Sequence, residues 1–340
     1  MPRGILIIFS AHDQTGVGQM LVRGMQPRPR IVTLLPAATE IVAALGRSEA
    51  IVGRSHECDY PPGVERLPVV TRPRSQLSAV LERGGAAIHA TISDLLARAL
   101  SIYEVDVTAL AQLAPDVIVT QAQCAACAID IDTLEEALRE IAMPRPRLVS
   151  LTATSLAGVL DDIGRIAEAV GSGHAAAKLC ESISQRLQGV TRRTAQAPKT
   201  QIACLEWLDP LMGAGNWMPE LALLAGGELL FGTPGQHTPS LDVKNLHRSD
   251  PSIILAIPCG FNLERAEREL LRCWPQLEFD RLHAARSKTV FVGDGQALFN
   301  RPGPRLVESL EVMAEILHPG LCRFGHEGRF WRRFSPPARV

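Results

Sequence analysis

RIVTLLPAATEIVAALG (30–46) joins a β-branched run, a proline turn and an apolar helix in one short segment. Ile31 to Leu35 is typical of a buried strand, and Thr39 to Leu45 carries apolar residues at helical spacing. Thr39 is a suitable N-cap residue, and Gly46 marks the end of the helix. A strand that leads directly into a helix is the unit of parallel sheets, so this segment predicts an α/β fold.

The same alternation of strands and helices continues on both sides of a helical stretch. Strand-like runs stand at 51–54, 116–120 and 148–151, whereas 155–195 carries only helical patterns. Its second helix, from about His174 to Arg192, would be roughly 28 Å long at the rise of an α-helix. The alternation restarts after residue 198, so the chain predicts two α/β lobes with mainly parallel sheets, joined by a long rigid helix.

This pattern divides the 340 residues into five parts, and a chain of this length normally exceeds one core. The expected parts are a poorly ordered extension (1–28), an N-terminal α/β lobe (29–154), a helical connector (155–197), a C-terminal α/β lobe (198–325) and a basic tail (326–340).

Composition excludes several kinds of partner. With 46% hydrophobic and 21% charged residues the chain is an ordinary globular protein, and its formal net charge of -1 argues against nucleic acid. The sequence has no run of about 18 apolar residues, so no membrane insertion is expected. The apolar stretch Gly4 to Ser10 is short for a signal peptide. A cytoplasmic location is therefore expected, with a periplasmic one as the alternative if the start of the sequence hides a signal.

A cluster of donor groups stands where the predicted strand at residue 51 ends. His56, Glu57, Cys58 and Asp59 follow that strand, and the loop QAQCAAC (121–127) follows another. Open α/β sheets bind ligands beyond the carboxyl ends of their strands, so the two loops predict one ligand cleft between the lobes.

The residues expected to bind ligand come from all the loops that would line this cleft. Three of them, Trp207, Trp217 and Phe261, offer flat apolar area for a macrocycle. Trp217 could instead open a helix and pack locally. The predicted ligand-binding residues are Pro36, Ala37, Thr39, Ser55, His56, Glu57, Tyr60, Gln121, Glu206, Trp207, Trp217, Phe261, Asp294 and Phe299.

The cysteines allow a sharper hypothesis. Cys124 and Cys127 have CxxC spacing, and with Cys58 and His56 they could form a Cys₃His site for a transition metal such as zinc or iron. Alternatively, His56 donates an axial nitrogen to a cobalt centre, or the two cysteines form a redox dithiol. In the simplest alternative they are small loop residues, and His56 bonds to neighbouring backbone. These alternatives stay open.

The segment RPGPR (301–305) precedes an apolar closing helix. Arg301 or Arg305 could meet a ligand carboxylate or phosphate, and pairing with a buried carboxylate of a lobe is the interpretation we favour. The sequence contains neither a nucleophile elbow nor a P-loop, so binding without turnover is favoured over an enzyme.

Five strings resemble a known family: RIVTLLPAATEIVAALG (30–46), SHECDYPP (55–62), LEWLDPL (205–211), PELALLAGG (219–227) and NRPGPRLVESLE (300–311). Together they resemble the cobalamin-type substrate-binding proteins of ABC importers, in the helical-backbone class of the iron-siderophore and cobalamin periplasmic-binding-protein superfamily. The resemblance covers about residues 30–320.

The resemblance implies a small metal-chelate ligand clamped between two lobes, either cobalamin or a related corrinoid, and an ABC permease as partner. The alternative is an intracellular metal-binding protein or metalloenzyme that uses the Cys/His site on the same fold.

Overall fold

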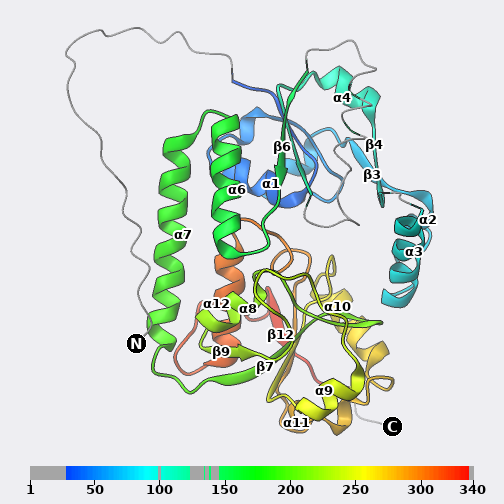
Figure 1. Cartoon of the computed structure of the whole chain (residues 1–340), viewed down its shortest axis with the longest axis vertical. Helices are drawn as coiled ribbons and strands as arrows, with labels where there is room; N and C mark the ends of the chain where they lie inside the picture. The colour runs from blue at the N-terminus through cyan, green and yellow to red at the C-terminus, as the bar shows by residue number, and fades with distance from the viewer. Residues whose placement is uncertain (1–27, 99–100, 123–133, 135–137, 139–144, 337–340) are drawn as a thin grey trace, which may run out of the picture.

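The computed structural model describes residues 28–98, 101–122, 134, 138 and 145–336. Two α/β lobes are stacked along the long axis of the molecule, and a long helix runs down one side of both (Figure 1). This arrangement confirms the predicted fold class, including the mainly parallel sheets.

The N-terminal lobe is built on a four-stranded parallel sheet of order β2-β1-β5-β6. Pro36 begins the helix that follows the first strand, at the position where its missing N–H has no intrahelical acceptor. Thr39, the predicted N-cap, lies buried inside this helix instead. The elements are β1 (Ile31–Thr33), α1 (Pro36–Ala44), η1 (Ser48–Ala50), β2 (Ile51–Arg54), β5 (Val117–Gln121) and β6 (Arg147–Leu151).

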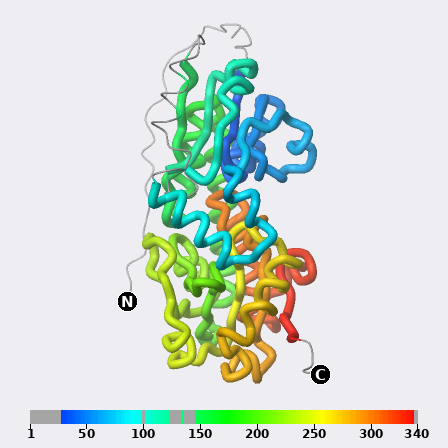
Figure 2. Tube along the Cα trace, turned by 90° about the vertical axis from the view of Figure 1, so that its right-hand side faces the viewer, coloured from blue at the N-terminus to red at the C-terminus, as the bar shows by residue number. Residues whose placement is uncertain are grey.

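Between β2 and β5 the chain leaves this lobe and reaches the other one. Residues 74–98, which we call the arm, place Ile88 and Leu95 in one apolar cluster with Leu270 of the C-terminal lobe. Figure 2 shows the arm, in cyan, crossing to the lower lobe. The elements here are η2 (Val64–Arg66), β3 (Thr71–Pro73), α2 (Ser75–Ser78), α3 (Gly85–Ala97), β4 (Tyr103–Val105) and α4 (Val107–Leu113), with β3 antiparallel to β4.

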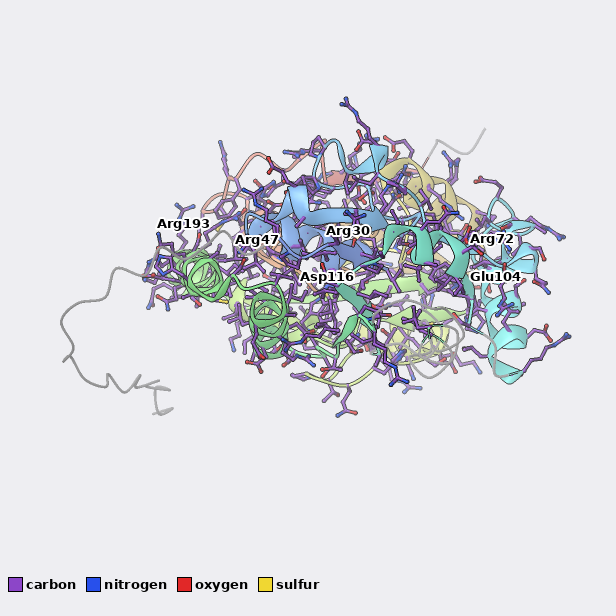
Figure 3. The ribbon with its side chains drawn as sticks, turned by 90° about the horizontal axis from the view of Figure 1, so that it is seen from above. Arg30, Arg47, Arg72, Glu104, Asp116 and Arg193 are labelled. Atoms are coloured by element: carbon purple, nitrogen blue, oxygen red, sulfur yellow. The ribbon has the colours of Figure 1, made fainter. Side chains whose placement is uncertain are left out.

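Two helices connect the lobes on the opposite side. They are α6 (Leu156–Ala169) and α7 (Gly173–Thr194), and the 22 residues of α7 span about 33 Å. Seen from above, Arg193 of α7 and the Arg72–Glu104 ion pair at the base of the arm lie at opposite sides of the molecule (Figure 3). The lobes are therefore joined on both flanks.

The C-terminal lobe contains a six-stranded sheet of order β12-β11-β10-β7-β8, with β9 also paired to β7. β7, β9, β10 and β11 are parallel, whereas β8 and β12 run antiparallel to their neighbours. The strands are β7 (Thr200–Leu208), β8 (Leu211–Gly213), β9 (Gly227–Leu229), β10 (Ile253–Ala256), β11 (Val290–Gly293) and β12 (Trp331–Arg333).

The last strand differs from the expected basic tail at 326–340. Trp331 is buried, and its Nε1 donates a hydrogen bond to Glu315 Oε2 at 2.8 Å, so this segment is fixed to the lobe. The helices of the lobe are α8 (Met218–Leu224), α9 (Val243–Ser249), α10 (Leu263–Cys273), η3 (Phe279–Arg281), α11 (His283–Arg286) and α12 (Leu306–Leu317). Within the described residues, all helices are too short or too polar to cross a membrane.

Asp162 ties the end of β6 to α6. Its side chain is completely buried, and Oδ2 accepts the backbone N–H groups of Thr152 and Ala153, each at 3.1 Å. Arg165 pairs with the same carboxylate. This carboxylate therefore fixes how the connector leaves the N-terminal sheet.

We expect Asp162→Ala to lower the free energy of unfolding by about 3 kcal/mol, because two backbone N–H groups lose their acceptor. The exposed neighbour Asp161 offers a matched control, since Asp161→Ala should change stability by less than about 0.5 kcal/mol. Urea denaturation followed by circular dichroism measures both variants. Equal losses would contradict the role assigned to Asp162.

Candidate functional site

The loop after β2, residues 55–60, is held in shape by the last residue of that strand. The buried Arg54 donates from Nη1 to the carbonyl oxygens of Ser55 at 2.9 Å and Cys58 at 3.2 Å. Its Nη2 donates to the carbonyl oxygen of Glu65 at 2.8 Å. Because one planar guanidinium satisfies three carbonyl groups, the loop has a fixed conformation.

His56 is oriented by a chain of hydroxyl groups. Thr71 Oγ1 accepts the backbone N–H of His56 at 3.0 Å, lies 2.7 Å from His56 Nδ1, and donates to Ser55 Oγ at 3.0 Å. Since the hydroxyl hydrogen of Thr71 is used toward Ser55, the proton of the imidazole belongs on Nδ1. Burial lowers the pKa of His56, so the ring is neutral and Nε2 carries a lone pair.

Tyr103 closes the other side of this loop, and residue patterns alone did not point to it. Its hydroxyl donates to Glu57 Oε1 at 2.7 Å, and its ring meets the His56 ring edge-on with centroids 5.0 Å apart. The chain contains two tyrosines, and the other, Tyr60, lies in the loop itself under the guanidinium of Arg305. Scarcity of tyrosine was the signal that could have identified Tyr103. Thr71 offered no comparable signal.

In the C-terminal lobe two of the predicted aromatic residues form a pair. The rings of Trp207 and Phe261 are edge-on with centroids 5.3 Å apart, and Trp207 Nε1 donates to the carbonyl of Asp209 at 3.0 Å. Beside them, the carboxylate of Glu206 accepts a hydrogen bond from Thr238 Oγ1 at 2.9 Å.

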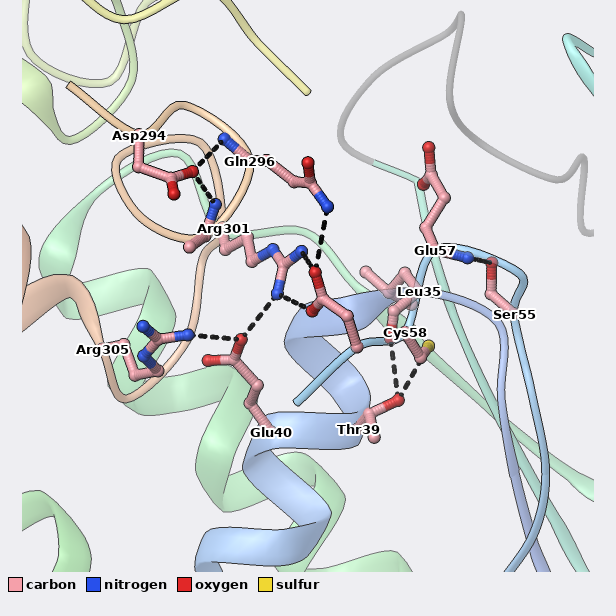
Figure 4. A network of polar contacts seen from close by, with 12 residues as sticks. Leu35, Thr39, Glu40, Ser55, Glu57, Cys58, Asp294, Gln296, Arg301 and Arg305 are labelled. Atoms are coloured by element: carbon pink, nitrogen blue, oxygen red, sulfur yellow. Dashed lines mark hydrogen bonds and ion pairs between the residues drawn. The ribbon is translucent and has the colours of Figure 1, made fainter. Parts of the chain in front are cut away.

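Gln296 connects this pair to the loop of the other lobe. Its Nε2 donates to Asp59 Oδ2 at 3.0 Å, and its backbone N–H donates to the carbonyl of Phe261 at 3.1 Å. Asp294 shapes the turn by accepting the N–H groups of Gln296 and Ala297, and burial raises the pKa of its carboxyl group (Figure 4). The two halves of the predicted site are thus joined by direct contacts.

Arg301 forms a buried ion network between the lobes (Figure 4). Its Nη1 donates to Glu40 Oε1 at 3.0 Å and to Asp59 Oδ1 at 2.7 Å, while Nη2 donates to Asp59 Oδ2 at 3.0 Å. Arg305 lies 3.5 Å from the same Glu40 oxygen. The predicted pairing with a lobe carboxylate is confirmed.

Burial and charge act in opposite directions on these groups. Burial raises the pKa of Glu40, although the charges of Arg301 and Arg305 oppose it. Burial also favours the neutral form of Asp59, but the hydrogen bonds and charge of Arg301 hold its pKa below the ordinary value. For Arg301, burial alone would lower the pKa, and the two carboxylates raise it instead. The guanidinium therefore stays charged.

Of the predicted ligand residues, Ala37 and Phe261 belong to the hydrophobic core, and so do Trp217 and Phe299. Trp217 is 3% exposed, and its Nε1 donates to the carbonyl of the fully buried Phe299 at 2.7 Å. Their predicted place against a ligand is corrected: the Trp217 ring packs locally, because the helix that begins after it covers the sheet.

The remaining predicted residues lie near the strand ends of the N-terminal lobe. Pro36 and Gln121 are half-buried, whereas Ala37 is buried. Thr39 is completely buried, and its Oγ1 lies 2.7 Å from Thr33 Oγ1. Thr39 also contacts the loop after β2, because its Oγ1 donates to the Cys58 sulfur at 3.0 Å.

The structure gives the proposed Cys₃His metal site no support. Thr39 Oγ1 donates to the Cys58 sulfur at 3.0 Å, and burial raises the pKa of this thiol, which disfavours the thiolate that metals bind. Among the residues that the structure describes, no group of three or more His, Cys, Asp or Glu could hold a metal ion. Cys124 and Cys127 lie outside the described residues, so this site stays a prediction.

We expect Arg301→Gln to lower the free energy of unfolding by about 3–5 kcal/mol, because Glu40 would remain buried without its main counter-charge. Arg147→Gln is the control, since the Arg147–Glu168 pair is exposed and should contribute less than about 1 kcal/mol.

The double variant Glu40→Gln/Arg301→Gln, measured by the same denaturant unfolding, should lose less stability than Arg301→Gln alone. If the single and double variants were equally destabilised, the ion network would not be the cause of the loss.

Residues 31–297 match the family model described as periplasmic binding protein. The chain is 24% identical over 298 residues to the vitamin B12-binding protein of Vibrio cholerae serotype O1, covering 86% of this chain and 90% of that protein. The resemblance seen in the five sequence strings is therefore confirmed for the superfamily.

Solved structures agree on the fold. The crystal structure of the periplasmic vitamin B12 binding protein BtuF of Vibrio cholerae aligns with a TM-score of 0.60 and 20% identity, over 86% of this chain and 97% of that one. A periplasmic heme binding protein from Pseudomonas aeruginosa aligns with a TM-score of 0.65 and 18% identity, over 86% and 94%.

The family match corrects one expectation. The short apolar stretch near the N-terminus predicts a cytoplasmic location, and this prediction is wrong, because the matched family is that of periplasmic binding proteins. The prediction depended on residues 1–27, which lie outside the described residues. Since the matched residues make up more than half of its length, the chain belongs to the periplasmic binding protein family.

Proposed function

We propose that this protein binds a cobalamin-like corrinoid, or another metal-centred macrocycle such as heme, between its lobes and delivers it to an ABC permease. The family supports a substrate-binding role, and relatives named for vitamin B12 and heme support this class of ligand. Delivery to a permease rests on the family alone.

The observation that carries the proposal is the state of His56. The hydroxyl groups of Thr71 and Ser55 hold the ring with its proton on Nδ1, so Nε2 is a neutral nitrogen donor. Among the described residues, no hydrogen bond to Nε2 is formed. Neutral imidazole is a common ligand of iron and cobalt, and one such donor completes a coordination sphere that a macrocycle otherwise fills.

The second support is the apolar surface that Trp207 provides. Its ring is half-buried against Phe261, and Gln296 links Phe261 to the loop that carries His56. Flat apolar side chains with a few placed polar groups are typical of sites for large planar ligands. The proposal therefore assigns the metal to His56 and the ring system to Trp207.

We expect Trp207→Ala to weaken cobalamin binding by about tenfold or more, because an aromatic contact surface is lost. Trp217→Phe is the control, since Trp217 lies in the core and its replacement should lower the melting temperature while leaving affinity within about twofold. Isothermal titration with aquocobalamin, cyanocobalamin and hemin measures all three proteins. A chain that binds none of these ligands would overturn the proposal.

Coordination of the macrocycle's metal by His56 can be detected in the absorption spectrum of the ligand. Aquocobalamin exchanges its coordinated water for imidazole, whereas cyanide occupies that position in cyanocobalamin, so only the former should change its absorption spectrum on binding. His56→Ala should remove this change, and His174→Ala, at an exposed position in α7, should preserve it. A spectral change that survives in His56→Ala would assign the ligand to another residue.

The lowered pKa of His56 predicts how ligation depends on pH. Since the folded-state pKa lies below the ordinary value of about 6.5, the lone pair is available at neutral pH and is lost as the pH falls through the lowered pKa. Affinity for aquocobalamin should therefore be constant from about pH 7 to 6.5 and decrease toward pH 5. The decrease should be absent in His56→Ala. Equal pH dependence in both proteins would contradict the assignment.

A further inference from the structure

A cavity outside the proposed ligand site lies where the arm meets α10. It has a volume of about 150 Å³, which is room for several water-sized groups. The arm contributes the turn between α2 and α3, and α10 contributes one face. The lining residues are Leu81, Glu82, Arg83, Gly84, Arg265, Arg268, Glu269 and Arg272.

The charge of this lining is positive. Four arginines and two glutamates give a formal net charge of +2. Glu269 is already engaged, because it pairs with Arg272 and its Oε1 accepts the backbone N–H of Gly85 at 2.8 Å. Glu82 acts on Arg265, so both carboxylates are counted in the lining and its net charge is still +2.

The arginines divide into two that hold the arm and two that are unpaired. Arg265 donates to the carbonyl of Leu81, and Arg272 Nη1 donates to the carbonyl of Arg83 at 3.1 Å. The guanidinium groups of Arg83 and Arg268 have no hydrogen bond or ion pair with any residue that the structure describes. Burial also lowers the pKa of Arg265, and a bound anion would offset this cost.

The turn of the arm is built to pass close to these groups. Gly84 has a φ of +97°, and a Cβ on it would collide with the guanidinium of Arg272. A side chain at this position would push into the guanidinium and strain the backbone, so glycine lets the turn and α10 enclose the cavity together.

We propose that this cavity binds a small tetrahedral oxyanion, inorganic phosphate or sulfate, and that the anion fastens the arm to the C-terminal lobe. Guanidinium groups present forked donors that match the oxygens of such anions. Arg83 from the arm and Arg268 from α10 would contact the same anion, so binding adds a link between the lobes. The proposal goes beyond macrocycle binding and does not depend on it.

The test is isothermal titration of the full chain with inorganic phosphate and with sulfate, each at constant ionic strength set by sodium chloride. Wild type should bind one anion, and Arg268→Gln or Arg83→Gln should weaken binding by about tenfold. Both positions are exposed, so the variants should fold. Arg98→Gln, an exposed arginine at the end of α3, is the matched control and should bind as wild type does.

A second measurement tests the fastening of the arm. Phosphate should slow amide hydrogen exchange in α3 of the wild type and leave exchange in Arg268→Gln unchanged. The proposal is overturned if phosphate binds no better than chloride, or if Arg268→Gln and Arg98→Gln lose affinity equally. Because no macrocycle is present, these outcomes are independent of the proposed ligand.

Discussion

The pairing of Arg301 with Glu40 and Asp59 fixes how the two lobes face each other. Glu40 belongs to α1, Asp59 to the loop after β2, and Arg301 to the segment before α12, so one guanidinium joins three separate parts of the chain. A buried carboxylate is costly without its partner, and small displacements of one lobe would therefore be opposed strongly. Asp59 is three residues from His56, which means that the same pairing also positions the proposed donor.

Two further connections act with this network. The 22-residue helix α7 packs along α12 and carries the Arg186–Glu311 pair, while the arm places its apolar residues in the C-terminal core. These connections lie on opposite flanks, with Arg301 between the lobes. Attachment at several points favours a site that is largely formed before ligand binds, and less of the binding free energy is then needed to order it. The oxyanion cavity lies in one of these connections, and its occupancy would change how firmly that flank is held.

The sequence predicted those parts of the molecule that local periodicity decides. The strand and helix at 30–46, the long connector helix and the two-lobed α/β fold follow from the spacing of apolar residues over short windows. The pairing of Arg301 could be anticipated, because an arginine beside a buried helix needs a counter-charge.

Long-range contacts could not be predicted in this way. The arm carries an ordinary amphipathic pattern that does not specify which lobe it covers, and Trp331, the one aromatic residue of β12, is next to arginines in the sequence. Trp217 and Trp207 look alike in sequence, yet one packs in the core and the other against Phe261.

The loop after β2 also shows the difference between sequence and long-range contacts. Its sequence is compatible with a Cys₃His metal site and with an axial nitrogen from His56, and only the contacts of each side chain distinguish the two. His56 and Cys58 are two residues apart, but adjacent side chains of the loop point to different partners. The thiol is buried against Thr39 and stays protonated, whereas the imidazole is oriented by the hydroxyl oxygen of Thr71, which accepts its Nδ1–H, and stays neutral. A site that assembles its own metal needs several ionised or neutral donors aimed at one point. The contacts of the described residues instead leave one nitrogen donor at the strand end, and a single donor suits a metal that arrives already held by its macrocycle.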